Sequence, residues 1–316
     1  MTAISENPST GQYSLSFADG STATASAVIA CDGIKSVARQ QYVLSSVSDQ
    51  RVCRPVFANE YAYRGMFSRS KFLEVSGGTI PVGKGILFCG PDSYAVMYPV
   101  EKGSLMNVVA IKRISTDTAA SEFASLQHET NWTQPVTTET MLSDFEAWGE
   151  PIKNLLRHIE KPERWALYDH LPAPTYVKGR VALMGDAAHA TTPHQGQGAG
   201  MAFEDSFILS TILGKILNEP GSISEAENNK SEMLCGKIES CFRAYDEVRR
   251  PRTQAVTRTS REMGELLGFA GEGTGRNLAK MKVNFDTRMN WIWDVDLLGE
   301  VEKGVKIAKR ELNSML

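Results

Sequence analysis

The stretch from Gly185 to Ala199 concentrates residue types that can bind a small molecule. Its sequence, GDAAHATTPHQGQGA, contains one carboxylate, two histidines and three glycines. A carboxylate such as that of Asp186 accepts hydrogen bonds from sugar-like hydroxyl groups. Glycines such as Gly196 and Gly198 allow the backbone to turn tightly and to approach a ligand closely. The composition of this stretch therefore indicates a binding loop for a polar ligand.

The elements on either side of this loop would position it. The apolar run RVALMGD predicts a short parallel strand that ends at Asp186, and an apolar helix is predicted from about Gly198 to Leu217. Ligands of open α/β sheets bind at the carboxyl ends of the strands, and the first amides of a helix attract negative charge. The alternative is a purely structural role, in which Asp186 caps a turn and the glycines serve only strand-to-helix packing.

A second junction likewise has a strand, an adjacent Asp and Gly, and a polar turn. It is VIACDGIKSVAR, residues 28–39, in which Asp32 and Gly33 follow the apolar strand. Two such junctions suggest that one ligand lies across both. The simpler interpretation of Asp32-Gly33 is an ordinary β-turn.

Metal binding and disulfide bonding are both disfavoured. His189 and His194 are five residues apart across a proline and have no third ligand nearby, whereas structural metal sites need a closed ligand set. The five cysteines are odd in number and show no C-x-x-C spacing, which favours a reducing, cytoplasmic compartment.

The segment from about Arg51 to Arg113 predicts an antiparallel layer of strands, in which Arg64 is the residue of interest. It lies in the strand-like run YAYRGMF, where a buried charge needs a partner carboxylate or a ligand. A structural ion pair is the commoner outcome; the alternative is that Arg64 is the catalytic-site anchor for a phenolate or carboxylate of a substrate. Tyr63, Tyr98 and Asn107 are candidates for the pocket wall. Trp291 and Trp293 are predicted to be core residues.

Composition excludes several classes of partner. The 316 residues carry 34 Lys plus Arg against 37 Asp plus Glu, so the net charge of −3 gives no basic footprint for nucleic acid. No apolar run approaches the roughly 20 residues that span a bilayer, and the start of the chain does not resemble a signal peptide. We expect no membrane partner, and the oligomeric state is not predicted.

The motifs together resemble a known family. The string G-D-A-A-H-A-x-x-P-H-Q-G-Q-G-A at Gly185 to Ala199 resembles the flavin-ribityl motif of single-component (group A) FAD-dependent aromatic hydroxylases of the salicylate hydroxylase type. CDGIKSVAR resembles the D-G-x-x-S-x-x-R motif of the same family. NWIWDVD resembles a tail of its fungal members, and the resemblance runs from about residue 12 to about residue 300.

The resemblance implies a role for each matching residue. Asp186 would bind the ribityl hydroxyls, Pro193 would lie beside the isoalloxazine, and the backbone of Gly196, Gln197, Gly198 and Ala199 would face its N1/O2 edge. Asp32, Gly33, Ser36 and Arg39 would lie near the FAD pyrophosphate and would be tied to NAD(P)H use.

The resemblance also implies the activity. NAD(P)H would reduce FAD, the reduced flavin would add O2 as a C4a-hydroperoxide, and a small aromatic substrate, either a phenol or an aromatic acid, would be hydroxylated. The cofactor carries the chemistry in such enzymes, and the protein orients and excludes water.

The expected fold class is α/β (α+β mixed): an incomplete FAD-binding Rossmann-like domain, an antiparallel-sheet substrate domain and C-terminal helices. The expected segments are 1–50 and 179–260 for the FAD-binding domain, 51–178 for the substrate domain and 261–316 for a helical tail.

One family element is not found. A strand, a G-x-G-x-x-G turn and a helix normally bind the ADP half of FAD, and none of the 26 glycines lies in such a setting. This leaves an alternative hypothesis, in which the chain is a truncated, non-catalytic homologue that does not hold FAD tightly.

Overall fold

The chain forms two compact units in the computed structural model, which describes residues 1–115, 132–219 and 227–315. The first unit comprises Met1–Val56, Tyr168–Ser260 and Arg288–Leu316, and the second comprises Phe57–Leu167 and Arg261–Thr287. The chain therefore crosses between the units near residues 56 and 167, not near 50 and 178. Residues 261–287 belong to the second unit, so the predicted C-terminal tail is divided between the two.

The first unit opens with an antiparallel sheet of three short strands. They are β1 (Ala3–Glu6), β2 (Tyr13–Ser16) and β3 (Thr22–Ala25). Asp19 and Gly20 lie in the β2–β3 turn, where the carboxylate of Asp19 accepts hydrogen bonds from the amide and hydroxyl of Ser21. This is the Asp-Gly hairpin that the alternating sequence predicts.

A parallel pair of strands forms the second sheet of this unit. β4 (Val28–Ala30) pairs in parallel with β12 (Val181–Leu183), with Val28 opposite Val181. β11 (Val177–Lys178) adds an antiparallel edge. All three residues of β12 are buried, as the apolar run predicted.

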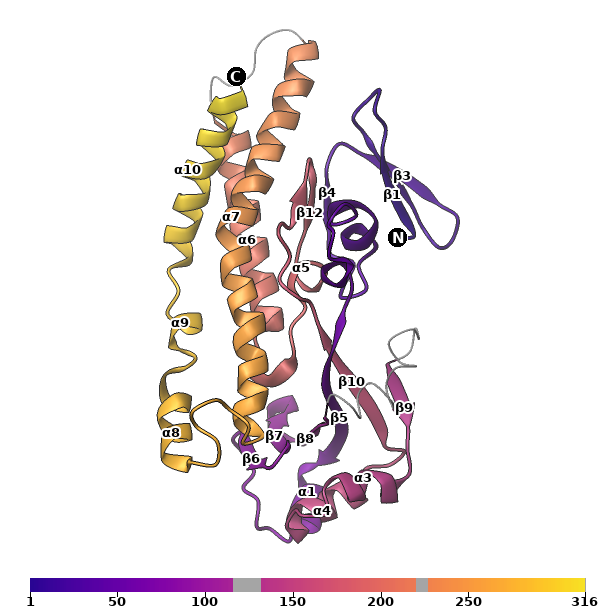
Figure 1. Ribbon diagram of the computed structural model, residues 1–316, viewed down its shortest axis with the longest axis vertical. Coiled ribbons are helices and arrows are strands. Elements are labelled where there is room, and N and C mark those ends of the chain that lie inside the picture. Colours follow the sequence, from indigo (N-terminus) through magenta and orange to yellow (C-terminus); the bar gives the residue numbers. More distant parts are fainter. Residues whose placement is uncertain (116–131, 220–226, 316) are drawn as a thin grey trace. The chain divides into compact units, whose positions relative to one another are not determined.

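Three long helices pack together in the first unit (Figure 1). They are α6 (Gly198–Leu217), α7 (Glu227–Leu267, which continues into the second unit) and α10 (Leu297–Met315). α6 has the bounds that the sequence predicted. Ile208, Ile212 and Ile216 of α6 are buried at four-residue spacing, and α10 approaches so closely that a Cβ at Gly304 would lie 2.4 Å from Ile212.

The short elements of the first unit connect these layers. They are a π-helical turn (Arg39–Val43), two 3-10 helices (Gln50–Cys53 and Pro193–Gln195), α5 (Asp186–His189) and α9 (Asn290–Trp293). Both tryptophans of α9 are exposed, so the prediction that Trp291 and Trp293 are core residues is wrong. Trp291 instead lies against the guanidinium of Arg252, 5.6 Å from the ring centroid.

The second unit is built on a six-stranded sheet with the order β6-β7-β8-β5-β10-β9. The strands are β5 (Val56–Ser68), β6 (Ile86–Gly90), β7 (Ser93–Val100), β8 (Leu105–Arg113), β9 (Thr133–Pro135) and β10 (Glu163–Asp169). Tyr61 and Tyr63 alternate with Ala62 and Arg64 along β5, which places the two pairs on opposite faces.

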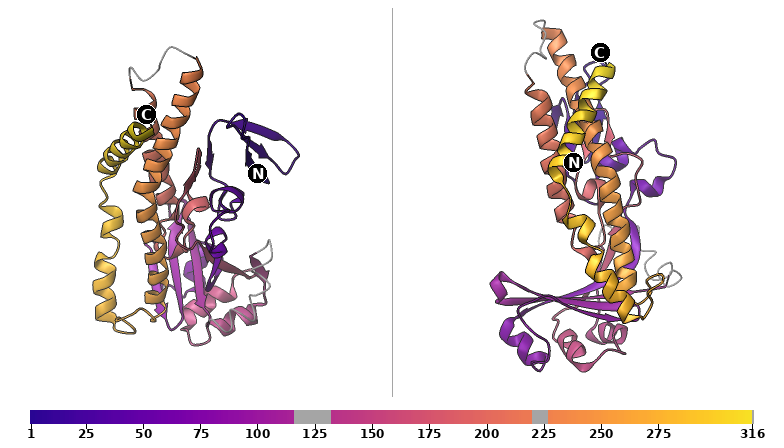
Figure 2. Two further views of the ribbon diagram at one scale, coloured as in Figure 1. Left: turned by 45° about the horizontal axis from the view of Figure 1, so that its top comes forward. Right: turned by 90° about the vertical axis from the view of Figure 1, so that its left-hand side faces the viewer.

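Helices cover one face of this sheet (Figure 2). They are α1 (Arg69–Val75), α3 (Thr138–Asp144) and α4 (Glu150–Arg157); α8 (Leu278–Thr287) also belongs to this unit. The sequence predicts one amphipathic helix across Met141 to Leu156, but the structure has two. Phe145 ends the first with non-helical backbone angles, and Gly149 caps the second, which has Pro151 in its first turn.

Candidate functional site

The parallel pairing of β4 and β12 brings Asp32-Gly33 and Gly185-Asp186, the two junctions that follow these strands, to one edge of the sheet. The amide of Met184 donates to the carbonyl of Ala30 at 3.0 Å, so the strands stay in register to their ends. Asp32 follows one strand and Asp186 the other, as the sequence predicted.

Asp186 presents its carboxylate at this edge. It is exposed and forms no hydrogen bond or ion pair within the part of the chain that the structure describes. The preceding residue, Gly185, is buried with φ +56° and ψ −136°, a conformation that favours glycine. Its amide donates to the Asp205 carboxylate at 3.1 Å, and a Cβ there would lie 3.3 Å from Ala202. Asp186 is thus fixed next to the first turns of α6.

The loop between α5 and α6 is pinned to α7. Thr192 and Ser260 exchange two hydrogen bonds, of 3.0 and 2.7 Å, and the hydroxyl of Thr259 donates to Gln195 Oε1 at 3.1 Å. Gln195 is buried, and its Nε2 has no hydrogen-bond partner. A buried amide donor without an acceptor is costly. The Gln195 Nε2 group has no acceptor among the described residues, and a ligand carbonyl would supply one.

Three of the loop positions that the resemblance assigns to the cofactor are open to solvent. Pro193, Gly196 and Ala199 are all exposed, and Gly196 adopts a left-handed conformation with φ +65° before α6 begins.

α6 begins without a side-chain cap. Its first internal backbone bond joins the amide of Met201 to the carbonyl of Gln197, at 3.0 Å. The amides of Gly198, Ala199 and Gly200 precede that bond and have no intrahelical acceptor. These amides and the helix dipole attract negative charge.

A buried charge network lies directly beneath α5 and the first turns of α6. His189 Nε2 lies 2.6 Å from Asp205 Oδ2, and Arg249 donates to Asp205 Oδ1 at 2.8 Å and to Glu204 at 2.7 Å. Arg252 adds two bonds of 2.8 Å to Glu204. Burial opposes ionisation of Asp205, but His189 and Arg249 outweigh it and lower its pKa. His189 is therefore a partner of a carboxylate.

Sequence reasoning missed this network, although a signal for it existed. Glu204 and Asp205 interrupt an otherwise apolar run in α6, and two acidic residues in such a run require buried partners. Arg249 and Arg252, in the segment VRRPR at residues 248–252, are these partners. Among the described residues no group of three or more potential metal ligands occurs.

The D-G-x-x-S-x-x-R motif proves to be an internally bonded unit. Asp32 accepts hydrogen bonds from the hydroxyl of Ser36 and from the amides of Val37 and Ala38 at 2.8 and 3.2 Å. It therefore caps the helical turn that follows, and Gly33 begins that turn with φ +77°. The role of Asp32 is therefore structural and goes beyond that of a residue in a simple β-turn. Its carboxylate is already engaged by Ser36, Val37 and Ala38.

Arg39 does not face a ligand, contrary to what the resemblance implied. It is fully buried, and its guanidinium donates to the carbonyls of Val52 (2.7 and 2.9 Å), Ala187 (3.2 Å) and Ala188 (2.7 Å). Burial lowers its pKa to about 10. With its donors occupied, Arg39 cannot also contact a pyrophosphate; it binds the D-G-x-x-S-x-x-R unit to α5.

The candidate substrate residues divide between the two faces of the second unit's sheet. Asn107 lies opposite Met66 on β5 and opposite Tyr98 on β7, and Arg64 lies opposite Val109, so Arg64, Tyr98 and Asn107 share a face. This face carries exposed apolar side chains, namely Met66, Leu87, Tyr98 and Trp165. Asn107 is 3% exposed and its Nδ2 has no hydrogen-bond partner.

Arg64 has no partner carboxylate among the described residues. It is exposed, and its guanidinium lies 5.8 Å from the centroid of the Trp165 ring. The expected structural ion pair is therefore not the outcome, and the fork of Arg64 remains available to an anion.

Tyr63 lies on the opposite face and does not belong with the other candidates. It is fully buried, its hydroxyl donates to Asp144 at 2.6 Å and accepts from Arg164 at 3.0 Å, and its ring packs on Phe145. The residue fixes α3 to the sheet. The structure thus removes Tyr63 from the group of pocket residues.

Comparison with known proteins identifies the class. The chain belongs to the FAD-binding domain family, whose model matches residues 67–232. It is 33% identical over 93% of its length to 6-methylsalicylate 1-monooxygenase atA of Aspergillus terreus, and 32% identical over 91% to a salicylate hydroxylase of Pseudomonas putida. It spans 60% and 62% of the length of these two relatives.

A solved structure agrees. A salicylate hydroxylase substrate complex superposes with a TM-score of 0.80 at 37% identity, covering 96% of this chain and 70% of that one. The expected fold class, a mixed α/β flavin-binding fold with an antiparallel sheet and C-terminal helices, is confirmed.

Proposed function

We propose that this chain provides the flavin-binding and substrate-binding parts of an FAD-dependent monooxygenase that hydroxylates a small aromatic substrate with NAD(P)H and O2. The observation that supports it most is the free carboxylate of Asp186 beside the uncapped start of α6. A ligand held there needs hydroxyl groups at one point and an electron-rich edge at the other. The ribityl chain and pyrimidine edge of a flavin have both.

The described residues fit the cofactor. Asp186 would accept hydrogen bonds from the ribityl hydroxyls, and the amides of Gly198 and Ala199 would face the edge of the ring that gains negative charge on reduction. The unpartnered Nε2 of Gln195 offers one more donor. When bound, FAD supplies the redox chemistry that links NAD(P)H, O2 and substrate. The chain's own contribution is to hold the ring edge with donors that cannot rotate away, each charge-assisted bond being worth about 1.5 to 3 kcal/mol.

The substrate class follows from the face shared by Arg64, Tyr98 and Asn107. Exposed apolar and aromatic groups on this face suit a flat ring, Asn107 offers an unsatisfied donor, and Arg64 offers a planar cation for a carboxylate or phenolate. The names of two relatives, a 6-methylsalicylate 1-monooxygenase and a salicylate hydroxylase, support an aromatic acid or phenol.

Other parts of the proposal rest on fewer observations. A cytoplasmic location is supported by five free cysteines, and no described helix is long and apolar enough to cross a membrane. The alternative, a non-catalytic homologue, gains no support from these relatives, which are monooxygenases or a hydroxylase by name.

Turnover tests the proposal. The purified chain, supplied with FAD and NADH or NADPH, should oxidise the reduced nicotinamide faster when salicylate is added, and should yield a hydroxylated product. The Gly196→Val variant should lose this stimulation, because a β-branched residue is strained at φ +65°. A chain that binds FAD but shows no stimulation with a panel of aromatic acids and phenols would overturn the proposed activity.

A further inference from the structure

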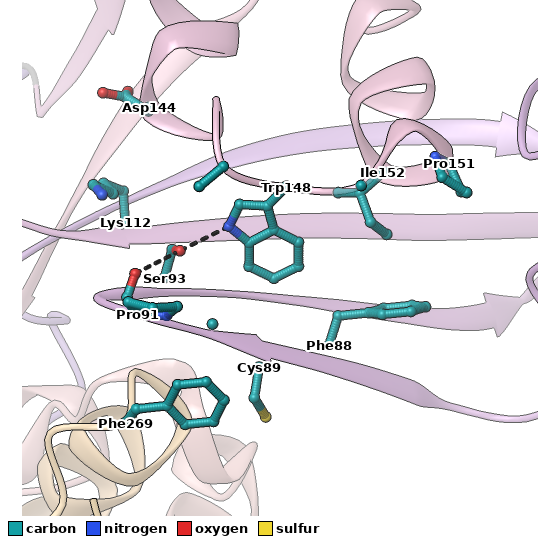
Figure 3. Close-up of a pocket in the computed structure, with 13 residues that line it drawn as sticks. Phe88, Cys89, Pro91, Ser93, Lys112, Asp144, Trp148, Pro151, Ile152 and Phe269 are labelled. Atoms are coloured by element: carbon teal, nitrogen blue, oxygen red, sulfur yellow. Dashed lines mark hydrogen bonds between the residues drawn. The ribbon is translucent and has the colours of Figure 1, made fainter. Parts of the chain in front are cut away.

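A cavity of about 440 Å³ lies at the end of the β6–β7 hairpin in the second unit (Figure 3). It is lined by the hairpin, by the connection between α3 and α4, and by Phe269. Its volume is in the range of small-molecule sites, about 300 to 1,000 Å³. None of the residues assigned above to the flavin or to the substrate lines it.

The cavity is separate from the proposed substrate face. Lys112 and Asn107 are five positions apart on β8, and side chains alternate along a strand, so the two residues point to opposite faces. Lys112 pairs with Ser93 of β7, and Asn107 pairs with Tyr98. The cavity's cation is therefore on the face covered by α3 and α4.

Trp148 is fixed as one wall of the cavity. Its Nε1 donates to Ser93 Oγ at 2.9 Å, and that hydroxyl donates to the carbonyl of Pro91 at 3.0 Å (Figure 3). A Cβ at Gly90 would lie 2.9 Å from Cζ2 of the indole, so only glycine at position 90 leaves room for the ring. The Trp148 ring is therefore held in place by a hydrogen bond to Ser93 and by its close fit against Gly90.

Phe269 contributes a second ring from a strained backbone. It has φ +62°, a left-handed conformation that is rare and strained for a bulky residue. The conformation is held by the hydrogen bond, 2.9 Å long, from the amide of Asp92 to the carbonyl of the preceding Gly268. Such strain is a signal of function when the ring it positions lines a cavity.

Lys112 gives the cavity its charge. It is partly buried and forms no hydrogen bond or ion pair with the residues that the structure describes. Asp144 lies at the same end (Figure 3), but Tyr63 and Arg164 already engage its carboxylate, at 2.6 and 3.3 Å. Cys89 carries no charge near neutral pH, because burial raises the pKa of its thiol to about 11. One free cation thus stands beside an apolar, aromatic wall.

We propose that this cavity is a second binding site, which takes a planar aromatic carboxylate with its ring against Trp148 and its charge toward Lys112. The aromatic walls would receive the ring and Lys112 the anion, a charge-assisted contact. Binding at this cavity requires no FAD and does not depend on the proposed monooxygenase activity. The two proposals can therefore be tested separately.

A calorimetric titration of the flavin-free chain with 2-naphthoate tests the proposal. We expect Lys112→Met to weaken one binding event about tenfold, the loss of one charge-assisted contact. Lys84→Met should leave it unchanged, because Lys84 is exposed, has no partner among the described residues and lies outside the cavity. The neutral 2-naphthamide should bind the Lys112→Met variant as well as the parent.

Two further variants separate this site from the substrate face. Gly90→Val should abolish the same event by displacing Trp148, with circular dichroism reporting that the chain is folded; if it does not fold, Lys112→Met carries the test. Arg64→Ala should leave the event intact. Equal affinity of the parent and the Lys112→Met variant for 2-naphthoate, or loss of all binding in Arg64→Ala, would overturn the proposal.

Discussion

The guanidinium of Arg39 donates a hydrogen bond of 2.7 Å to the carbonyl of Ala188, 149 residues further along the chain. This bond joins the segments that follow β4 and β12 of the parallel sheet through a buried cation that has only backbone carbonyls as acceptors among the described residues. Asp186 lies two residues before Ala188. The placement of the free carboxylate at the proposed flavin site therefore depends on a residue whose own side chain is fully buried.

Arg39→Met should lower the free energy of unfolding by about 3 kcal/mol, because it leaves buried carbonyls of Val52, Ala187 and Ala188 without donors. Urea denaturation measures the effect. Arg51→Met, which removes an exposed arginine paired with Asp49, should change stability by less than about 0.5 kcal/mol. Equal effects of the two substitutions would contradict the structural role of Arg39.

Arg249→Met should cost about 3 to 5 kcal/mol, since it removes the guanidinium that pairs with the buried carboxylate of Asp205 and leaves that carboxylate with the His189 imidazole and the Gly185 amide. The double variant Arg249→Met with Asp205→Leu should recover part of that loss, because no buried charge remains unpaired. Arg243→Met is the control: its pair with Glu239 is half-exposed, and such pairs contribute little. If the double variant is less stable than Arg249→Met by the full cost of a second deletion, the two residues do not interact as described.

Stability should fall on the acid side because of His170. Burial lowers the pKa of this residue to about 3, and its Nε2 lies 3.0 Å from the carbonyl of Ile34. The unfolded chain takes up a proton below about pH 6.5 and the folded chain does not, so this residue removes up to about 1.4 kcal/mol per pH unit between about 6.5 and 3.

The slope of unfolding free energy against pH from 6.5 to 5 measures this contribution. His170→Gln is the matched variant, because an amide can still donate to Ile34 but does not titrate in this range. The variant should show a shallower slope than the parent protein; identical slopes would mean that His170 is protonated in the folded state as easily as in the unfolded chain.

Arg64→Ala should raise the dissociation constant for salicylate about tenfold in the flavin-loaded protein, because an anion anchor is lost. Flavin content and stability should not change, since Arg64 is exposed and has no ion pair among the described residues. Arg69→Ala, five residues away and also exposed, is the control. Loss of flavin in Arg64→Ala would favour a structural role.

The elements that the sequence predicted well are those whose signal is local. The apolar run of β12 and the Gly198 to Leu217 bounds of α6 are both found, because strand burial and helix ends depend on adjacent residues. The helix over Met141 to Leu156 fails because apolar spacing continues through Phe145 and Gly149, where the backbone turns.

Site residues were predicted less well where the deciding contacts are distant in sequence. Strand alternation separates Tyr63 from Arg64, but only the packing of α3 shows which face is covered. The acceptors of Arg39 lie up to 149 residues away, so no local pattern could reveal its burial. Asp186 was correctly placed at the sheet edge because a parallel strand brings its next residue there regardless of the rest of the chain.

The most direct test of the proposed flavin site is the affinity of the Asp186→Ala variant for FAD and for FMN. Quenching of flavin fluorescence on binding measures this affinity. The ribityl chain is common to both flavins, so the variant should bind each of them at least about tenfold more weakly than the parent, by about the same factor. Asp294→Ala removes an exposed aspartate elsewhere in the same unit and should have no effect. Unchanged affinity of Asp186→Ala for both flavins would contradict the assignment of this carboxylate to the ribityl chain.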